Sequence, residues 1–322
     1  MNFDKSIIIV AGEPNSVFLE IFFKSLKKIK IKKPLILIAS KKLVKLQMSK
    51  LNFKMKIRIL NDENISKLKL DNKRINLIDV NYNTSKAFET ISSKSNSYIE
   101  GCFKIALKII KKNNFKRLIT GPISKKYFLK KKYLGITEYI SKKLGVKKNA
   151  MLIYNRNISV CPLTTHLPLK YVTKKIDKKL IIEKVKLISD FYTNNFKFKP
   201  KIGVLGVNPH CESVDRFNED DKILKPAIKI LKKQKYKIQG PLSADTAFLK
   251  KNLKNFNVIL GMYHDQVLTP MKTLFEYNAV NITLGLPFLR VSPDHGPNER
   301  MIGKNISNPL SLIQAISFLD KN

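Results

Sequence analysis

Three of the four histidines stand in polar loops that each follow an apolar run, and imidazole is a common protein ligand of zinc-type cations. His166 lies in Leu-Thr-Thr-His-Leu-Pro-Leu, His210 in Gly-Val-Asn-Pro-His and His264 in Met-Tyr-His-Asp-Gln. The fourth, His295, lies in the turn-like Pro-Asp-His-Gly near the C-terminus. The pattern predicts a three-histidine site for a divalent metal, assembled by the fold.

A second interpretation stays open for each of these histidines. A single histidine after a buried strand often serves only as a hydrogen-bonding residue. The three also lack a short spacing, such as His-x-x-x-His, that would make metal binding specific.

Further polar motifs follow the segments that look like strands. They are Gly-Pro-Ile-Ser-Lys at 121–125, Asn-Pro-His at 208–210, Tyr-His-Asp-Gln at 263–266 and the run 283–290 that ends in Arg290. In open α/β sheets, ligands bind at the carboxyl ends of the strands. Because the motifs gather at such ends, they favour an enzyme over a structural protein.

Short β-branched runs alternate with lysine-bearing amphipathic segments, which is typical of an α/β protein with a mostly parallel sheet. We expect strands at 6–11, 33–39, 117–120, 151–154, 202–207, 258–262 and 280–284. We expect helices at 16–28, 98–112 and 309–319, and one that opens at 121–125. The lysine-rich residues 41–73 show less pattern and are predicted to be a peripheral elaboration, and no internal repeat is visible.

The composition is that of a globular protein with an unusual charge. The 322 residues are 43% hydrophobic, enough for one large or two smaller domains, and carry a net charge of +38. Such a charge could bind nucleic acid, but the basic residues are mostly lysines spread along the whole chain, so a nucleic-acid partner is not expected. A positive field would instead attract anionic substrates and cofactors.

Compartment and membrane association follow from the same composition. No apolar stretch reaches the ~20 residues that span a bilayer, and the run at 7–10 is too short for a signal-peptide core. The three cysteines form no Cys-x-x-Cys pair, which fits a reducing compartment. We therefore expect a cytoplasmic protein without a membrane partner.

Taken together, the motifs resemble those of the 4-hydroxythreonine-4-phosphate dehydrogenase family. The resemblance is densest at 120–125, 135–138, 165–169 and 208–212, and is almost unbroken across 240–296. The C-terminal Asp-His-Gly and the run 307–316 also resemble the wider isocitrate and isopropylmalate dehydrogenase superfamily. No Gly-x-Gly-x-x-Gly follows the first predicted strand, so a Rossmann mode of cofactor binding is not supported.

The resemblance implies a fold and an assembly. It implies two α/β/α domains with the active site in the cleft between them. One domain would comprise residues 1–120 and 257–322, and the other residues 121–256 with the dimer interface. A homodimer with a shared active site is expected.

The resemblance also implies an activity. The enzyme would use NAD or NADP and a divalent metal (Zn, Co, Mg or Mn) to oxidise 4-phosphohydroxy-L-threonine. The resulting 3-oxo acid would lose carbon dioxide to give 3-amino-2-oxopropyl phosphate, in the biosynthesis of pyridoxal phosphate.

Residue roles carry over by position in this sequence. The metal ligands implied are His166, His210 and His264, which would meet across the dimer interface. The other roles are catalysis for Asp245 and Lys272; substrate binding for Thr137, Lys272, Asn281 and Arg290; and cofactor binding for Asp294, His295, Gly296 and Asn298.

The chain departs from the family pattern at three places. The family's Gly-His-Thr-Glu has Ile136 in place of histidine, and the cofactor loop carries Pro297, Asn298 and Arg300. The glycine-rich opening survives only as Gly-Glu-Pro-Asn-Ser-Val-Phe-Leu-Glu at 12–20. Three explanations remain open: a compensated pocket with the same activity, a related phosphorylated hydroxy acid as substrate, or a metal-binding dimer that has lost dehydrogenase activity.

Overall fold

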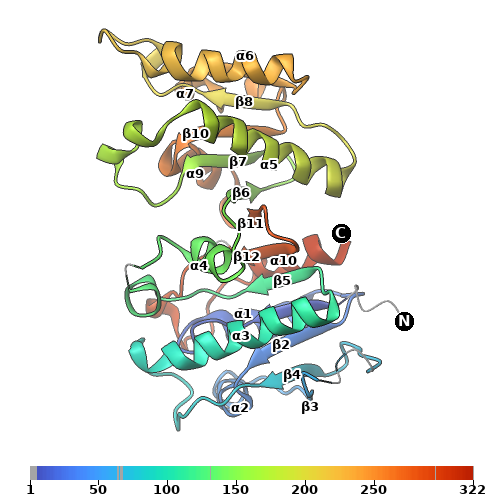
Figure 1. Cartoon of the computed structure of the whole chain (residues 1–322). Coiled ribbons are helices and arrows are strands. Elements are labelled where there is room, and N and C mark those ends of the chain that lie inside the picture. The colour runs from blue at the N-terminus through green and yellow to red at the C-terminus, as the bar shows by residue number, and fades with distance from the viewer. Residues whose placement is uncertain (1–5, 64, 66–67, 131, 294, 322) are drawn as a thin grey trace. The chain divides into compact units, whose positions relative to one another are not determined.

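The chain folds into two compact α/β units. The computed structural model describes residues 6–63, 65, 68–130, 132–293 and 295–321 (Figure 1). The first unit comprises Met1–Ile136 and Pro287–Asn322, and the second comprises Thr137–Leu286. These divisions lie later in the chain than the breaks expected at 120 and 257, because β10 (Val258–Tyr263) and β11 (Val280–Leu284) pair with strands of the second unit.

The first unit is built on a parallel sheet with the strand order β3-β4-β2-β1-β5-β12. Every residue of β1 and β2 is buried, which requires cover on both faces of the sheet. Helix α3 packs on β1 and β2, whereas α10 packs on β1, β5 and β12. The elements are β1 (Ile7–Val10), α1 (Phe18–Lys28), β2 (Leu35–Ala39), α2 (Lys41–Lys50), β3 (Ile57–Ile59), β4 (Ile75–Asp79), α3 (Asn96–Asn113), β5 (Arg117–Thr120), β12 (Leu289–Pro293) and α10 (Leu310–Lys321).

The second unit has a mixed sheet with the strand order β11-β6-β7-β10-β8-β9. Strand β6 runs antiparallel to β11 and β7, and the pairs from β7 to β9 are parallel. Besides β10 and β11, the elements are α4 (Ile136–Lys143), β6 (Ala150–Tyr154), β7 (Ser159–Thr164), α5 (Lys178–Phe196), β8 (Ile202–Leu205), α6 (Lys225–Lys233), β9 (Ile238–Leu242), α7 (Ala244–Ala247), α8 (Lys250–Leu253) and α9 (His264–Phe275).

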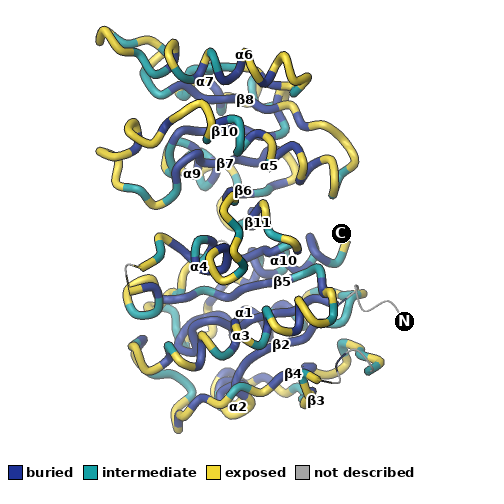
Figure 2. Tube along the Cα trace, viewed as in Figure 1, coloured by how far each residue is buried: buried dark blue, intermediate teal, exposed yellow. Residues whose placement is uncertain are grey.

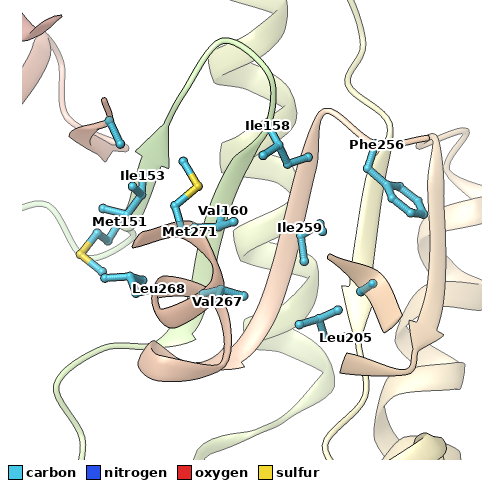
Figure 3. Close-up of a cluster of buried hydrophobic side chains, with 12 residues drawn as sticks. Met151, Ile153, Ile158, Val160, Leu205, Phe256, Ile259, Val267, Leu268 and Met271 are labelled. Atoms are coloured by element: carbon cyan, nitrogen blue, oxygen red, sulfur yellow. The ribbon is translucent and has the colours of Figure 1, made fainter. Parts of the chain in front are cut away.

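A buried hydrophobic cluster fixes helix α9 to the sheet of the second unit. Val267, Leu268 and Met271 of α9 pack with Val160 of β7 and Ile259 of β10 (Figure 3). Because α9 begins with His264 and also carries Lys272, this packing fixes the positions of two predicted site residues.

The strands and helices expected from sequence are confirmed, apart from shifts at their ends and the segment at 121–125, where only a short π-helical turn (Lys125–Leu129) forms. The expectation for residues 41–73 was wrong. They contain α2, which buries Leu43, Val44 and Met48, and the edge strand β3 (Figure 2). Lysines on the exposed positions of α2 obscured its apolar spacing.

No helix in the described part of the chain is long and apolar enough to cross a membrane.

Candidate active site

Two of the predicted metal ligands lie side by side at the carboxyl ends of neighbouring strands. His166 follows β7 by two residues, and His264 directly follows β10, which pairs with β7 in parallel. The Thr164 hydroxyl donates to the Met262 carbonyl at 2.8 Å and so joins the two strand ends. The ring centroids of His166 and His264 lie 5.4 Å apart.

This spacing fits two imidazoles on one metal ion. Metal–nitrogen bonds of ~2.0–2.1 Å in a tetrahedral arrangement would separate the ring centres by roughly 5 Å. The Nδ1 atom of His264 lies 2.6 Å from the Asp265 carboxylate, which leaves Nε2 for a ligand. A carboxylate on the other ring nitrogen is usual for a metal-binding histidine, since it fixes the tautomer and the orientation of the ring.

The third predicted ligand, His210, lies on the loop that follows β8, the other neighbour of β10. Buried Asp220 accepts hydrogen bonds from the backbone N–H groups of Val207 and Asn208 at 2.9 and 3.0 Å and so anchors the start of this loop. The Gln266 amide joins the ends of β8 and β10, because it donates to the Gly206 carbonyl at 2.8 Å.

His210 is linked to a predicted catalytic residue through a serine. Its Nδ1 atom lies 3.4 Å from the Ser243 hydroxyl, which donates to the Asp245 carboxylate at 2.7 Å. The Ser243 hydrogen bond lowers the pKa of the exposed Asp245 carboxyl, and the electrostatic interaction with His210 adds to the effect. Asp245 is therefore ionised at neutral pH and able to accept a proton.

Within the described ranges of one chain, no group of three or more His, Cys, Asp or Glu side chains could hold a metal ion. The topology nevertheless brings all three histidines to the carboxyl ends of the adjacent strands β7, β10 and β8.

The substrate candidates of the second unit gather on α4, β11 and α9. The hydroxyls of Thr137 and Thr283 lie 3.2 Å apart, both buried. Asn281 lies two residues before Thr283 on β11, so both side chains are on the same face of the sheet. The Asn281 Oδ1 atom is buried and has no hydrogen-bond partner among the described residues, which leaves it available to a ligand donor. Lys272 is half-buried on α9.

Arg290, the substrate candidate of the first unit, is almost fully buried on β12. Its Nε atom donates to the Thr120 hydroxyl at the end of β5 at 3.0 Å. A buried guanidinium held in a fixed orientation is suited to an anionic group such as a carboxylate or phosphate.

The predicted cofactor loop follows β12. Asp294 lies outside the described residues. The His295 Nδ1 atom lies 2.9 Å from the Gly296 carbonyl, and Asn298 is exposed with a left-handed backbone (φ 56°).

A pocket of ≈ 810 Å³ in the first unit borders this loop. The loop contributes Glu299 and Ile302 to its lining, and the other lining residues are Lys86, Phe88, Glu89, Thr90, Ile91, Ser92 and Lys94. The Asn15 side chain supports the wall of the pocket formed by residues 86–94, since its Oδ1 accepts a hydrogen bond from the Glu89 N–H at 2.8 Å.

The altered glycine-rich opening remains closely packed. The Ser16 hydroxyl donates to the Glu13 carbonyl at 2.7 Å, and Phe18 is buried at the start of α1. Close backbone approach is kept at Gly12 and Gly121, where an added Cβ would lie 2.3 Å from the Pro122 carbonyl oxygen and 2.1 Å from that of Ala11, respectively. Ile136, at the place of the family's histidine, is the half-buried first residue of α4.

Sequence reasoning missed the residues that hold the predicted ligands in place, namely Asp220, Ser243, Asp265 and Gln266. Asp265 and Gln266 could have been suspected because they adjoin His264 in one polar motif. Ser243 could also have been suspected, because it lies two residues before Asp245 in the stretch 240–296. Asp220 reaches the histidine loop only through the fold, so no local pattern marks it.

Comparisons with known proteins agree along almost the whole chain. The family model described as pyridoxal phosphate biosynthetic protein PdxA matches residues 30–319. A 4-hydroxythreonine-4-phosphate dehydrogenase of Sulfurihydrogenibium sp. (strain YO3AOP1) is 38% identical over 319 residues, which cover 96% of either chain. One of Aquifex aeolicus (strain VF5) is 35% identical over 322 residues, which cover 98% of either chain.

Solved structures agree on the fold. A proposed 4-hydroxythreonine-4-phosphate dehydrogenase from Salmonella typhimurium superposes with a TM-score of 0.86 at 26% identity, over 98% of this chain and 99% of that chain. A β-decarboxylating dehydrogenase from Thermococcus kodakarensis superposes with a TM-score of 0.55 at 11% identity, over 98% of this chain and 82% of that chain. The second likeness concerns the fold alone, and it agrees with the predicted α/β fold class.

Proposed function

The chain belongs to the PdxA family of pyridoxal phosphate biosynthetic proteins, and from this premise we propose that it oxidises 4-phosphohydroxy-L-threonine with NAD or NADP and a divalent metal. The 3-oxo acid formed then loses carbon dioxide and leaves 3-amino-2-oxopropyl phosphate. The observation that carries the proposal is the His166–His264 pair, set 5.4 Å apart at the carboxyl ends of two adjacent strands.

His166, His210 and His264 are the proposed metal ligands. When bound there, a divalent cation supplies Lewis acidity, which lowers the pKa of an alcohol and stabilises negative charge on its oxygen. Asp265 orients the His264 ring, and the link through Ser243 orients His210. Zinc, cobalt, magnesium and manganese are the candidate cations.

Each remaining site residue has a proposed task in the alcohol oxidation. Asp245 accepts the proton of the substrate hydroxyl. A bound nicotinamide would supply the acceptor for the hydride that the oxidation releases. The Lys272 ammonium binds substrate and stabilises negative charge on the reacting oxygen, and Asn281 Oδ1 accepts a hydrogen bond from a substrate N–H or O–H. Thr137 supplies a hydroxyl, and Arg290 binds an anionic group of the substrate.

The pocket of the first unit is proposed to receive the adenosine end of the nicotinamide cofactor. It borders the loop that bears the predicted cofactor residues His295, Gly296 and Asn298. Hydroxyl, ammonium and carboxylate groups line it, as a ligand with ribose and phosphate groups requires.

A homodimer is proposed to complete the metal site. The loops that carry the histidines also expose large apolar side chains, Leu169 and Tyr171 after His166, and Val214 and Phe217 after His210. Apolar residues grouped in this way mark a protein interface more often than free surface. Association of two copies would bury them and bring the third imidazole to the pair.

The test is reduction of NAD or NADP, followed by nicotinamide absorbance, with 4-phosphohydroxy-L-threonine before and after removal of metal by a chelator. Turnover that disappears with the metal and returns when it is added back is expected. No turnover by a metal-loaded dimer would contradict the proposal. Turnover with another phosphorylated hydroxy acid would then point to an altered substrate, and none with any would indicate a binding protein.

A further inference from the structure

Helix α1 holds both ends of the segment 297–307, which contains the loop side of the pocket. At the first end, the Val17 N–H just before α1 donates to the Pro297 carbonyl at 3.2 Å. At the second end, Glu20 and Lys24 of α1 bind the backbone of Asn305 and Ser307.

The second attachment is a network of four polar contacts. The Lys24 ammonium donates to the Glu20 carboxylate at 2.8 Å and to the carbonyls of Asn305 and Ser307 at 2.9 and 3.0 Å. The same Glu20 oxygen accepts the Ser307 N–H at 2.7 Å. We name Glu20 and Lys24 together the clamp.

Burial makes these contacts stronger than those of a surface ion pair. The Glu20 side chain is 1% exposed and that of Lys24 is 18% exposed. An ion pair so far removed from water is weakly screened by salt, and each partner depends on the other to offset the loss of hydration. The clamp therefore fixes the backbone at 305–307 firmly, although Asn305 and Ile306 themselves are exposed.

The segment that the clamp holds bears Glu299 and Ile302, which line the pocket. In the sequence, Gly303 lies between Ile302 and the residues that the clamp binds. A Cβ added at Gly303 would be 3.2 Å from the ring of Phe88, which also lines the pocket. A shift of the segment would therefore change the width of the pocket.

We propose that Glu20 and Lys24 are positioning residues for the pocket wall, and that by fixing the segment in advance they set the affinity for the nicotinamide cofactor. The cofactor part of this inference rests on the function proposed above. The physical reason is preorganisation: a wall that is already ordered loses less conformational entropy when a ligand binds.

The experiment compares Lys24→Met with Lys28→Met, a matched control that removes the same charge from an exposed position on the same helix. Trypsin cleavage after Arg300 and Lys304 is followed by mass spectrometry in the whole protein, because both residues lie in the held segment. Binding of NADH is measured by its fluorescence, and kcat and the KM values for cofactor and substrate are measured separately.

Lys24→Met is expected to accelerate cleavage in the segment by roughly tenfold, since local opening becomes easier. It is expected to raise the Kd and KM for the cofactor by about threefold to tenfold, with kcat at saturating cofactor and the KM for substrate nearly unchanged. Lys28→Met is expected to behave as the wild type. Lys24→Arg, which keeps the charge, is expected to restore most of the cofactor affinity.

Because Lys24→Met leaves the Glu20 carboxylate buried without its ammonium, Glu20→Gln/Lys24→Met is measured beside it. If trypsin cleaves both variants at the rate of Lys28→Met, Glu20 and Lys24 do not hold the segment 297–307. Faster cleavage with unchanged NADH affinity would overturn the role in cofactor binding and, with it, the assignment of the pocket. A wild type that binds no NADH would contradict the proposed function, while the cleavage rates would still decide whether the clamp holds the segment.

Discussion

At the scale of single residues, the carboxylate beside His264 is the feature that most directly adapts an imidazole to metal binding. The Asp265 carboxylate lies 2.6 Å from Nδ1 of His264 and thereby leaves Nε2 available to a metal ion. It lies in the first turn of α9, where the helix dipole also favours a negative charge. The neighbour of a predicted ligand can thus matter as much as the ligand.

Asp265→Asn is expected to weaken metal binding by about 10–100-fold, because the amide holds the ring less firmly and makes its nitrogen less basic. Competition with a chromogenic chelator measures the affinity without reliance on turnover. Asp190→Asn, on the exposed face of α5 in the same unit, is the matched control. Equal affinities of the two variants would show that Asp265 does not orient a ligand.

Glu13 is a second residue whose environment has a measurable consequence. Burial raises the pKa of its carboxyl above the ordinary 4.5, against hydrogen bonds from the Asn15 N–H and the Ser95 hydroxyl that lower it, and the nearby Glu299 carboxylate raises it further. The folded state therefore holds this proton more tightly than the unfolded chain. Its contribution to stability is present at low pH and is lost as pH rises from 4.5 through the raised value.

Glu13→Gln should raise the melting temperature by roughly 1–3 °C at about pH 8 and have little effect at about pH 5, because the amide carries no charge to bury. Calorimetry at both pH values measures the difference. Glu63→Gln, on the exposed surface, should leave both temperatures unchanged. A Glu13→Gln protein that is less stable at the higher pH would show that the ionised form is favoured.

At the scale of elements, Gly121 allows the close approach of the segments that follow β1 and β5. A Cβ on Gly121 would lie 2.1 Å from the Ala11 carbonyl oxygen and 2.9 Å from the ring of Phe18. Both neighbours are buried, so neither can move away cheaply. The ends of these strands also hold Thr120, the partner of Arg290.

Gly121→Ala is expected to destabilise the protein by about 3 kcal/mol, because the strand ends must separate to admit the methyl group. Gly101→Ala, inside α3, is the matched control. The added Cβ would lie 3.5 Å from the nearest atom, and alanine should raise the free energy of unfolding by about 0.5–1 kcal/mol. Urea unfolding compares the two. A Gly121→Ala protein as stable as the wild type would show that these ends have freedom to move.

Several elements escaped sequence reasoning for identifiable reasons. Strand β7 contains Pro162, β9 contains a Gly-Pro step and β12 ends in Pro293, and proline and glycine are unfavourable within strands. Helix α9 includes Pro270. In each element, pairing with neighbouring strands or packing against the core outweighs local propensity.

At the scale of the whole molecule, the proposed association of two chains can be tested on the apolar loops. Val214→Asp and Phe217→Asp are expected to shift the protein from dimer to monomer and to weaken metal binding, because charge cannot be buried at an apolar interface. Light scattering and the chelator competition measure the two effects together. Ile230→Asp on α6 is the control, since Ile230 is also exposed but belongs to no histidine loop. If both loop variants remain dimers and bind metal with unchanged affinity, the proposal is contradicted.

The sequence by itself determined the α/β class, most of the strands, the helices α1, α3 and α10, and the family, because hydrophobic periodicity and the order of motifs can be read from the chain alone. It also named His166 and His264, which the fold then placed together. Only the tertiary structure decided that β10 and β11 belong to the second unit and that Asp265, Ser243 and Asp220 support the histidines. It alone revealed that α1 holds the distant segment 297–307. These are contacts between residues far apart in sequence or set by side-chain orientation, and they exist only once strand pairing and packing have fixed the backbone.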